Sequence, residues 1–399
     1  MSRLEELIQQ YCPDGVEYKK IKEVYQRIKG TPITAGKMKE IQSPTGEIRI
    51  FAGGKTVIDA NECDIPNANI TRVPAVLVQS RGVIDAIYYD KPFTFKNEMW
   101  AYTHKEQTSV KFLYYVMKQN IQHFRDAASG MGALPQISLG TTEDFVIPVP
   151  PLPVQEEIVR ILDNFAELQA ELQAELQKRL QQYNYYRDKL LTFNDLNGGG
   201  YAVSVEWKKL GDVATFTYGY TAKAEECGEV RYIRITDIND GGSLTPDNGK
   251  YISLTKDTEP YLLKKGDLVM ARTGATYGKT LYYNEDYLSA YASFLIKINL
   301  QDLVNPRFYW HFSKSNLYWE QARKLVGGGA QPQFNTGAIS QIKIPIPSLE
   351  EQERIASILD RFDALTTNIT AGLPAEIEAR RKQYEYYRDQ LLTFKQKAS

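Results

Sequence analysis

The sequence predicts an α+β protein, in which two mixed α/β domains are separated by two long coiled-coil helices. Three observations support this fold class. The 399-residue chain repeats itself after nearly 200 residues, and each copy ends in a long segment with apolar residues at every third or fourth position. The rest of each copy is rich in β-branched and aromatic residues and is interrupted by turn residues.

The repeat is clearest around a proline-rich segment. Residues 147–158 read IPVPPLPVQEEI, and residues 344–355 read IPIPSLEEQERI. Further on, 185–193 (YYRDKLLTF) recurs as 386–394 (YYRDQLLTF), whereas the region from about 25 to 125 has little direct identity with the other half. We therefore expect four segments. They are a first domain with a short N-terminal helix (1–147), a proline hinge with a helix (148–200), a second domain (201–343), and a second hinge with a helix (344–399).

The first long helix is predicted over residues 154–193. No glycine or proline interrupts its apolar spacing, and forty residues at 1.5 Å each give a rod of about 60 Å. The prolines before it keep the chain extended and mark its start, and Gly198–Gly200 marks a linker after it. The second copy contains Gly372-Leu-Pro374, which predicts a break in that helix.

A long, thin amphipathic helix needs a partner to bury its apolar side. The simplest partner is the other copy, and an antiparallel pair would relate the two halves by a pseudo-two-fold axis. The alternative is that each helix packs on its own domain as an ordinary core helix. The apolar positions expected along the seam are Ile158, Phe165, Leu172, Leu180 and Tyr186 in the first helix, and Ile355, Phe362, Ile369 and Tyr387 in the second.

The first helix also carries three tandem Ala-Glu-Leu-Gln units, beginning at Ala166, Ala170 and Ala174. Each unit lengthens a helix by about 6 Å, close to the rise of two base pairs at about 3.4 Å each. The units could therefore set a distance between two domains. The alternative is a solvated filler segment of high helix propensity.

Both globular halves are predicted to contain mixed sheets. The expected strands are 47–52, 75–79, 86–89, 230–235, 267–271, 279–283 and 292–298, and the expected helices are 109–124 and 306–324. Several loops combine cationic or amide side chains with glycine, which lets a backbone approach a ligand closely. Arginine reads guanine, glutamine reads adenine, and Thr or Tyr can reach phosphates. The candidate DNA-contacting residues are Lys37, Ser80, Arg81, Gly82, Gln136, Tyr218, Tyr220, Thr221, Lys223, Arg272, Thr273, Tyr277, Lys279, Gln331 and Gln333.

Several function classes find no support in the sequence. The three cysteines are isolated and the three histidines show no metal-binding or triad spacing. The segment 274–280 resembles a phosphate-binding loop, but it has one residue too few between its glycines and lies between two predicted strands. There is no apolar segment long enough to cross a membrane and no secretory h-region, so we expect a cytoplasmic protein with no membrane partner.

The repeated motifs resemble a known family. Ile-Pro-x-Pro-x-Leu-x-x-Gln-Glu-x-Ile, followed by Tyr-Tyr-Arg-Asp-x-Leu-Leu, is similar in both copies to the specificity subunit of type I restriction-modification enzymes. The Gly-rich segments that lead into Pro-Gln, the stretch 80–85 (SRGVID) and the stretch 271–279 (ARTGATYGK) resemble the same family. The resemblance covers the entire chain, and the duplicated hinge and helix are its most specific part.

The resemblance implies a non-catalytic subunit that recognises double-stranded DNA. Each domain would be a target-recognition domain that reads one half of a split target. The helices, through the seam residues given above, would separate the domains and dock two modification (methyltransferase) subunits. Restriction (translocase/nuclease) subunits would join the same complex. The chain itself would bind no metal or cofactor, and its partners would use S-adenosylmethionine, ATP and Mg.

Two other functions are compatible with parts of the sequence: a coiled-coil scaffold whose domains bind protein, and a nucleoside triphosphatase. Domains that diverge while their helices stay alike favour a reader of two different half-sites over a symmetric scaffold. The net charge of −1 does not exclude DNA binding. The first and second domains carry net charges of +1 and +2, while the helical segments carry −3 and −1, and partners can supply part of the phosphate neutralisation.

Overall fold

The computed structural model describes residues 3–129, 134–193, 205–239, 241–245, 248–327, 332–367 and 372–397. The chain forms two compact units. Unit 1 comprises Met1–Glu171 and Glu378–Ser399, and unit 2 comprises Leu172–Ile377. Within the described residues, no helix combines the length and the apolar character needed to cross a membrane.

Unit 1 is built on three sheets. A four-stranded antiparallel sheet has the order β2-β8-β5-β6, a three-stranded sheet has the order β4-β3-β7, and β1 pairs with β9. In the three-stranded sheet β3 and β7 are parallel. The strands are β1 (Glu17–Lys20), β2 (Gln26–Lys29), β3 (Ile48–Phe51), β4 (Val57–Ala60), β5 (Ala75–Gln79), β6 (Asp85–Tyr89), β7 (Phe93–Phe95), β8 (Trp100–Thr103) and β9 (Val146–Val149).

Unit 2 repeats this topology. Its sheets have the orders β11-β17-β14-β15, β13-β12-β16 and β10-β18, and β12 is again parallel to β16. The strands are β10 (Glu206–Lys209), β11 (Ala214–Tyr218), β12 (Val230–Ile233), β13 (Tyr251–Ile252), β14 (Leu268–Ala271), β15 (Thr280–Tyr282), β16 (Ser289–Tyr291), β17 (Leu295–Leu300) and β18 (Lys343–Ile346). The α+β class with an internal repeat is therefore confirmed.

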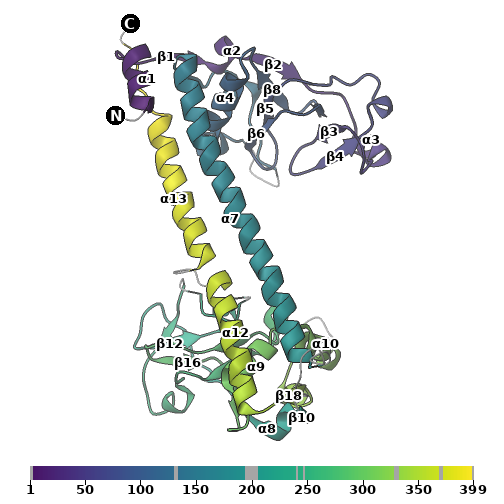
Figure 1. Ribbon diagram of the computed structural model, residues 1–399, viewed down its shortest axis with the longest axis vertical. Coiled ribbons are helices and arrows are strands. Elements are labelled where there is room, and N and C mark those ends of the chain that lie inside the picture. The colour runs from purple at the N-terminus through teal and green to yellow at the C-terminus, as the bar shows by residue number, and fades with distance from the viewer. Residues whose placement is uncertain are drawn as a thin grey trace. The chain divides into compact units, whose positions relative to one another are not determined.

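The helices include one of 41 residues, α7, whose first part belongs to unit 1 and whose second part belongs to unit 2. In unit 1, α4 packs on β5 and β6 of the four-stranded sheet (Figure 1). The helices are α1 (Arg3–Tyr11), α2 (Ile21–Val24), α3 (Ala35–Ile41), α4 (Gln107–Gln119), α5 (Ile121–Asp126), α6 (Leu139–Glu143), α7 (Leu152–Thr192), α8 (Leu210–Val213), α9 (Pro306–Phe312), α10 (Asn316–Leu325), α11 (Thr336–Ile339), α12 (Leu349–Thr367) and α13 (Leu373–Leu391). Short 3₁₀ turns lie at Glu62–Asp64, Ile235–Asp237, Glu259–Tyr261 and Gly274–Thr276.

Two predicted domain helices were wrong as single elements. The helix expected over 109–124 is divided into α4 and α5 at Asn120, whose side-chain amide donates to the Val116 carbonyl at 2.8 Å. The helix expected over 306–324 is divided into α9 and α10. Ser315 caps the second piece by accepting from the Tyr318 amide at 3.2 Å, and such side-chain bonds to the backbone compete with helix continuation.

Two predicted strands were also partly wrong. The strand expected over 230–235 ends at Ile233, because Arg234 begins a 3₁₀ turn that its ion pair with Asp237 stabilises at 2.8 Å. The strand expected over 292–298 starts only at Leu295, since the Leu295 amide bonds back to the Ala292 carbonyl in a turn.

The first part of each proline-rich segment is a strand, since β9 ends at Val149 and β18 ends at Ile346. Pro148 lies opposite Tyr18 in the β1–β9 pair, and Pro345 lies opposite Trp207 in the β10–β18 pair. Proline cannot donate a hydrogen bond but tolerates the extended backbone of an edge strand. Each two-stranded sheet therefore ties the start of a domain to the residues that lead into the long helix.

The long helices agree with the prediction. α7 is uninterrupted, whereas the second copy is divided into α12, which ends at Thr367, and α13, which starts at Leu373. Residues 368–371 lie outside the described residues, and so does the predicted linker Gly198–Gly200. The expected break at Gly372–Pro374 therefore falls where α13 begins.

Candidate nucleic-acid interface

The first group of predicted residues lies on a tight loop of unit 1. Gly82, with φ of +80°, adopts a conformation that favours glycine. Its amide donates to the Pro135 carbonyl at 2.8 Å, and the Ile137 amide donates to the Ser80 carbonyl at 2.9 Å. Arg81 thereby lies opposite Gln136 in an isolated antiparallel bridge. The loop after β5 and the Pro-Gln segment, far apart in the sequence, are thus brought together.

Unit 2 contains the same arrangement. Gly274, with φ of +69°, donates to the Pro332 carbonyl at 3.2 Å, and the Phe334 amide donates to the Arg272 carbonyl at 2.8 Å. Thr273 lies opposite Gln333 in the matching bridge. We call these two loop-plus-segment structures the recognition frames: 80–82 with 135–137 in unit 1, and 272–274 with 332–334 in unit 2.

The unit 1 frame stands between two grooves. One, of about 650 Å³, is lined by the frame residue Arg81 together with Lys39, Lys55 and Lys96. The other, of about 640 Å³, is lined by Gln136. Glu98 lines the same groove and pairs with Lys96 at 3.0 Å, whereas no carboxylate in the described part of the chain forms an ion pair with Lys39, Lys55 or Arg81. The groove therefore carries a net positive charge, which suits a phosphate backbone.

The unit 2 frame is more aromatic. The Arg272 guanidinium lies over the rings of Tyr218 and Phe294, at 5.2 and 5.5 Å from their centroids. Both rings are exposed, and the Nε–H of Arg272 donates to the Ser293 carbonyl at 3.1 Å. Because this stacking holds the guanidinium plane in place, Arg272 is well suited to the bidentate recognition of a base or phosphate.

The remaining predicted residues occupy several different environments, and among them Ser80 belongs to the unit 1 frame while the Tyr277 ring contacts Phe334 of the unit 2 frame at 6.1 Å. Tyr220 packs its ring against Tyr261 at 5.2 Å, and Tyr277 packs against Trp319 at 5.8 Å, so both rings are partly buried. Thr221 and Lys223 are exposed beyond β11, and Lys37 is exposed on α3 in an ion pair with Glu40. Ser80 is fully buried and donates to the Glu98 carbonyl. Gln331 lies outside the described residues.

Sequence reasoning missed several residues that line the grooves. In unit 1 they are Lys29, Lys39, Lys55, Lys96, Asn97 and Glu98. The Gly53-Gly54-Lys55 turn combines glycine with a cation and could have been found by the same rule that found the other loops. Glu98 in unit 1 and Phe294 in unit 2 carry no such signal, because the pairing of β5 with β8 and of β14 with β17 places them.

In each unit, an aspartate on a long helix joins that helix to the domain. In unit 1, Asp163 of α7 pairs with Lys111 at 2.7 Å and accepts from the Tyr115 hydroxyl at 2.5 Å. Both partners lie on α4, four residues apart. Burial and the neighbouring Asp163 carboxylate raise the pKa of Tyr115, so it remains a hydrogen-bond donor.

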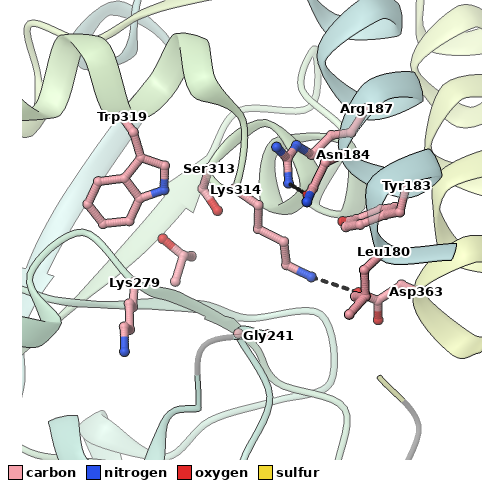
Figure 2. A pocket seen from close by; sticks show the side chains of 12 residues that line it. Leu180, Tyr183, Asn184, Arg187, Gly241, Lys279, Ser313, Lys314, Trp319 and Asp363 are labelled. Atoms are coloured by element: carbon pink, nitrogen blue, oxygen red, sulfur yellow. Dashed lines mark hydrogen bonds and ion pairs between the residues drawn. The ribbon is translucent and has the colours of Figure 1, made fainter. Parts of the chain in front are cut away.

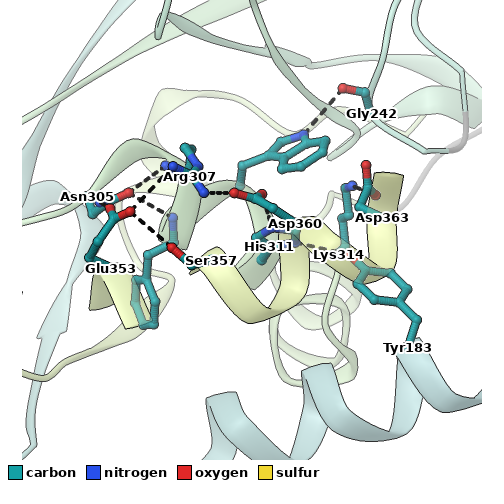
Figure 3. Close-up of polar contacts among 12 residues, drawn as sticks. Tyr183, Gly242, Asn305, Arg307, His311, Lys314, Glu353, Ser357, Asp360 and Asp363 are labelled. Carbon is teal, nitrogen blue, oxygen red and sulfur yellow. Dashed lines mark hydrogen bonds and ion pairs between the residues drawn. The ribbon is translucent and has the colours of Figure 1, made fainter. Parts of the chain in front are cut away.

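In unit 2 the corresponding aspartate is Asp360 of α12, which is held by Arg307 and His311 of α9 (Figure 3). The His311 Nε2 lies 2.8 Å from the carboxylate and its Nδ1 lies 3.1 Å from the Tyr183 hydroxyl. Burial lowers the pKa of His311 well below its usual value, and the cations Lys314 and Arg307 act in the same direction. The imidazole is therefore neutral, with Nε2 donating to Asp360 and Nδ1 accepting from Tyr183.

Next to this junction, Lys314 and Asp363 pair at 2.9 Å on the wall of a pocket of about 280 Å³ (Figure 2). Burial lowers the pKa of Lys314 to about 8 even though Asp363 favours its charged form. Lys279, a predicted DNA-contacting residue, lines this pocket with Trp319, so it stands beside the junction and not in the recognition frame.

The predicted seam residues divide into two groups. Ile158 and Ile355 are fully buried in the domain cores of their units, which agrees with the alternative that each helix packs on its own domain. Farther along, Phe165 stacks on Tyr387 of α13 at 5.5 Å, and Phe362 stacks on Tyr186 of α7 at 5.7 Å, both at an interplanar angle of 24°. Leu172 and Leu180 are half-buried, and Ile369 lies outside the described residues. Both ways of packing therefore occur along the same helices.

Comparison with known proteins finds similarity to type I restriction specificity subunits. The model of the type I restriction modification DNA specificity domain matches residues 13–182 and 203–379. The EcoR124I/EcoR124II specificity subunit of Escherichia coli is 34% identical over 72% of this chain and 72% of its own length. A putative type I restriction enzyme specificity subunit of Haemophilus influenzae is 35% identical over 74% of this chain and 77% of its own length.

A solved structure supports the fold. The type I restriction-modification S subunit from M. genitalium has a TM-score of 0.59 and a sequence identity of 16%, and the match covers 94% of this chain and 95% of that one. At this identity the likeness bears on the fold alone.

Proposed function

The chain belongs to the type I restriction-modification DNA specificity family, and from this premise we propose that its two units read the two halves of a split DNA target. The observation that carries the proposal is the pair of recognition frames. The same backbone hydrogen bonds recur in both units, while the side chains around them differ. A protein that reads two unlike half-sites needs this combination, because base identity is read by side chains on a positioned backbone.

The proposed domains are residues 1–147 and 201–343, and the proposed joining segments are 148–200 and 344–399. In this proposal the fifteen loop residues predicted from the sequence remain candidate DNA contacts, and the two frames are the first of them to test. The exposed faces of α7, α12 and α13 dock two methyltransferase subunits, and restriction subunits join the same complex. The reaction then belongs to those partners, which use S-adenosylmethionine, ATP and Mg, while this chain supplies the sequence selection.

Methylome sequencing of cells with and without the gene tests the proposal. We expect one split motif with an adenine methylated on each strand to disappear when the gene is deleted and to return when it is restored. A control strain that lacks only the methyltransferase partner should lose the same motif. If the gene is expressed and no split motif changes, the proposed function is wrong.

A further inference from the structure

The two recognition frames have a part that is the same and a part that differs. The same part consists of the left-handed glycine and the Pro-Gln segment, which make corresponding backbone hydrogen bonds in both units. The shared residues are Gly82, Pro135 and Gln136 in unit 1, and Gly274, Pro332 and Gln333 in unit 2. Both glutamines are exposed, so each presents the same amide group from the same backbone position.

The differing part can be matched position by position from the strand register. Lys29 ends β2 opposite Trp100, and Tyr218 ends β11 opposite Ile296. The residues two positions before these partners are Glu98 and Phe294.

The loop residues correspond as well, because Ser80 and Arg272 accept the same backbone hydrogen bond from the Pro-Gln segment. Unit 1 therefore places Lys29, Ser80 and Glu98 where unit 2 places Tyr218, Arg272 and Phe294.

These substitutions change the chemistry around an unchanged backbone. In unit 1, Lys29, Glu98 and Gln136 line one groove. The Glu98 carboxylate pairs with Lys96 at 3.0 Å, and its remaining lone pairs can accept from a cytosine amino group. In unit 2, Tyr218 and Phe294 occupy the positions of Lys29 and Glu98, and the Arg272 guanidinium lies over both of their rings. We find no hydrogen-bond partner for the terminal Nη atoms of Arg272 among the described residues.

We propose that each frame divides recognition between these two parts. The Pro-Gln segment contacts DNA in a way that is independent of base sequence and common to both half-sites. The accessible side chains at the differing positions, which in unit 1 exclude the buried Ser80, select the bases. Glu98 is the main selector in unit 1 and Arg272 the main selector in unit 2. The proposal rests on the function proposed above and assigns roles within it.

The experiment measures binding of the specificity chain, assembled with its methyltransferase partner, to the split target and to every single-base variant of that target. For Gln136→Ala and Gln333→Ala we expect affinity to fall by about three- to tenfold on every duplex, as for the loss of a neutral hydrogen bond. The preference for the correct base should stay unchanged. The salt dependence should also stay unchanged, because no charge is removed. Gln341→Ala, at another exposed position of unit 2, is the matched control and should have no effect.

Arg272→Lys and Glu98→Gln should behave differently. Arg272→Lys keeps the charge but loses the planar fork, and Glu98→Gln keeps the size but loses the carboxylate. Each should relax selectivity about tenfold or more at one base pair of one half-site and leave the other half-site unchanged. Arg323→Lys is the matched control for the arginine substitution. Thermal melting of each variant verifies that it is folded.

The outcomes separate the two proposals. Selectivity lost at one base pair in Gln136→Ala or Gln333→Ala, or a uniform loss in Arg272→Lys and Glu98→Gln, overturns the division within the frame. If the unaltered complex prefers no split target, the proposed function itself fails before the frame is tested.

Discussion

At the scale of single residues, the two units use different side chains to join a long helix to its domain. An aspartate of the long helix is held by two residues that lie four positions apart on a domain helix. In unit 1 the pair is Lys111 and Tyr115, and in unit 2 it is Arg307 and His311. Tyr115 remains protonated at any physiological pH, whereas His311 is a group whose ordinary pKa lies close to neutrality. The two junctions should therefore differ in their response to acid.

We predict that unit 2 loses stability in mild acid because of His311. Its pKa in the folded protein is lowered below the unfolded value of 6.5, so below pH 6.5 the unfolded chain takes up a proton that the folded chain does not. The contribution is present above pH 6.5 and is lost as the pH falls, at about 1 kcal/mol per pH unit. Urea unfolding of the unaltered protein and of His311→Gln between pH 7.5 and 5.5 measures it.

The difference between the two proteins isolates the histidine from the carboxylates that also titrate. His311→Gln should flatten the pH dependence of unfolding relative to that of the unaltered protein. Equal slopes for His311→Gln and the unaltered protein would show that His311 is not the group responsible.

The sequence was informative about residues whose role is local. Gly82, Gly274 and the Pro-Gln segments stand out because a turn or a close backbone approach requires those residue types, and the structure brings them together. Glu98 and Phe294 were not predicted, because only strand pairing places them beside the frames. The rings of Tyr220 and Tyr277, which are candidate DNA contacts, pack against neighbouring rings of unit 2. An aromatic side chain in a loop has no sequence feature that separates packing from binding.

At the scale of secondary-structure elements, length and periodicity decided how well each was predicted. The 41 residues of α7 repeat one pattern without interruption, so its ends were found within two residues. The domain helices were predicted too long because the divisions at Asn120 and Ser315 depend on side-chain hydrogen bonds to the backbone. The proline segments were interpreted as hinges because their strand partners, β1 and β10, lie far away in the sequence.

The tandem Ala-Glu-Leu-Gln units of α7 lead to a prediction about the spacer between half-sites. The helix is continuous through all three units, and removing Ala170–Gln173 shortens it by about 6 Å. We expect the methylated motif to lose about two base pairs of spacer while both half-site sequences stay the same. Sequencing of methylated DNA from cells that carry the deletion measures both quantities together.

A substitution that keeps the helix length is the control for this deletion. Glu171→Gln changes an exposed side chain of the same unit and should leave the spacer unaltered. A deletion that methylates the original spacer would mean that the units are filler, and a deletion that changes a half-site sequence would mean that α7 takes part in base selection.

At the scale of the whole molecule, the two units differ in how many stretches of the chain form them. The two ends of the chain meet in unit 1, where the Val16 amide donates to the Lys395 carbonyl and the Lys397 amide donates to the Val16 carbonyl, both at 2.9 Å. A side chain at Gly15 would lie 2.4 Å from the Lys395 carbonyl oxygen, so glycine is required there. Unit 1 is thus assembled from both ends of the sequence, whereas unit 2 is one continuous stretch, Leu172–Ile377.

This difference makes residues 201–343 the better segment to exchange. We predict that replacing them with the corresponding segment of a relative changes one half-site of the methylated motif and leaves the other half-site and the spacer unchanged. The physical reason is that the unit 1 frame keeps all of its own hydrogen bonds and groove residues, which come from residues 27–139. Methylome sequencing of cells that express the exchanged protein gives the new motif.

The exchange must preserve the junction with the long helices to be interpretable. Within unit 2 the incoming segment has to supply equivalents of Arg307 and His311 for Asp360, and of Asn316 for Asp188, to which it donates at 2.7 Å. A second exchange restores these three residues in the incoming segment. It distinguishes an effect of a misplaced domain from an effect of the exchanged base-selecting residues. If both half-sites still change in that protein, the two units do not select their bases independently, and the division of the target between them is wrong.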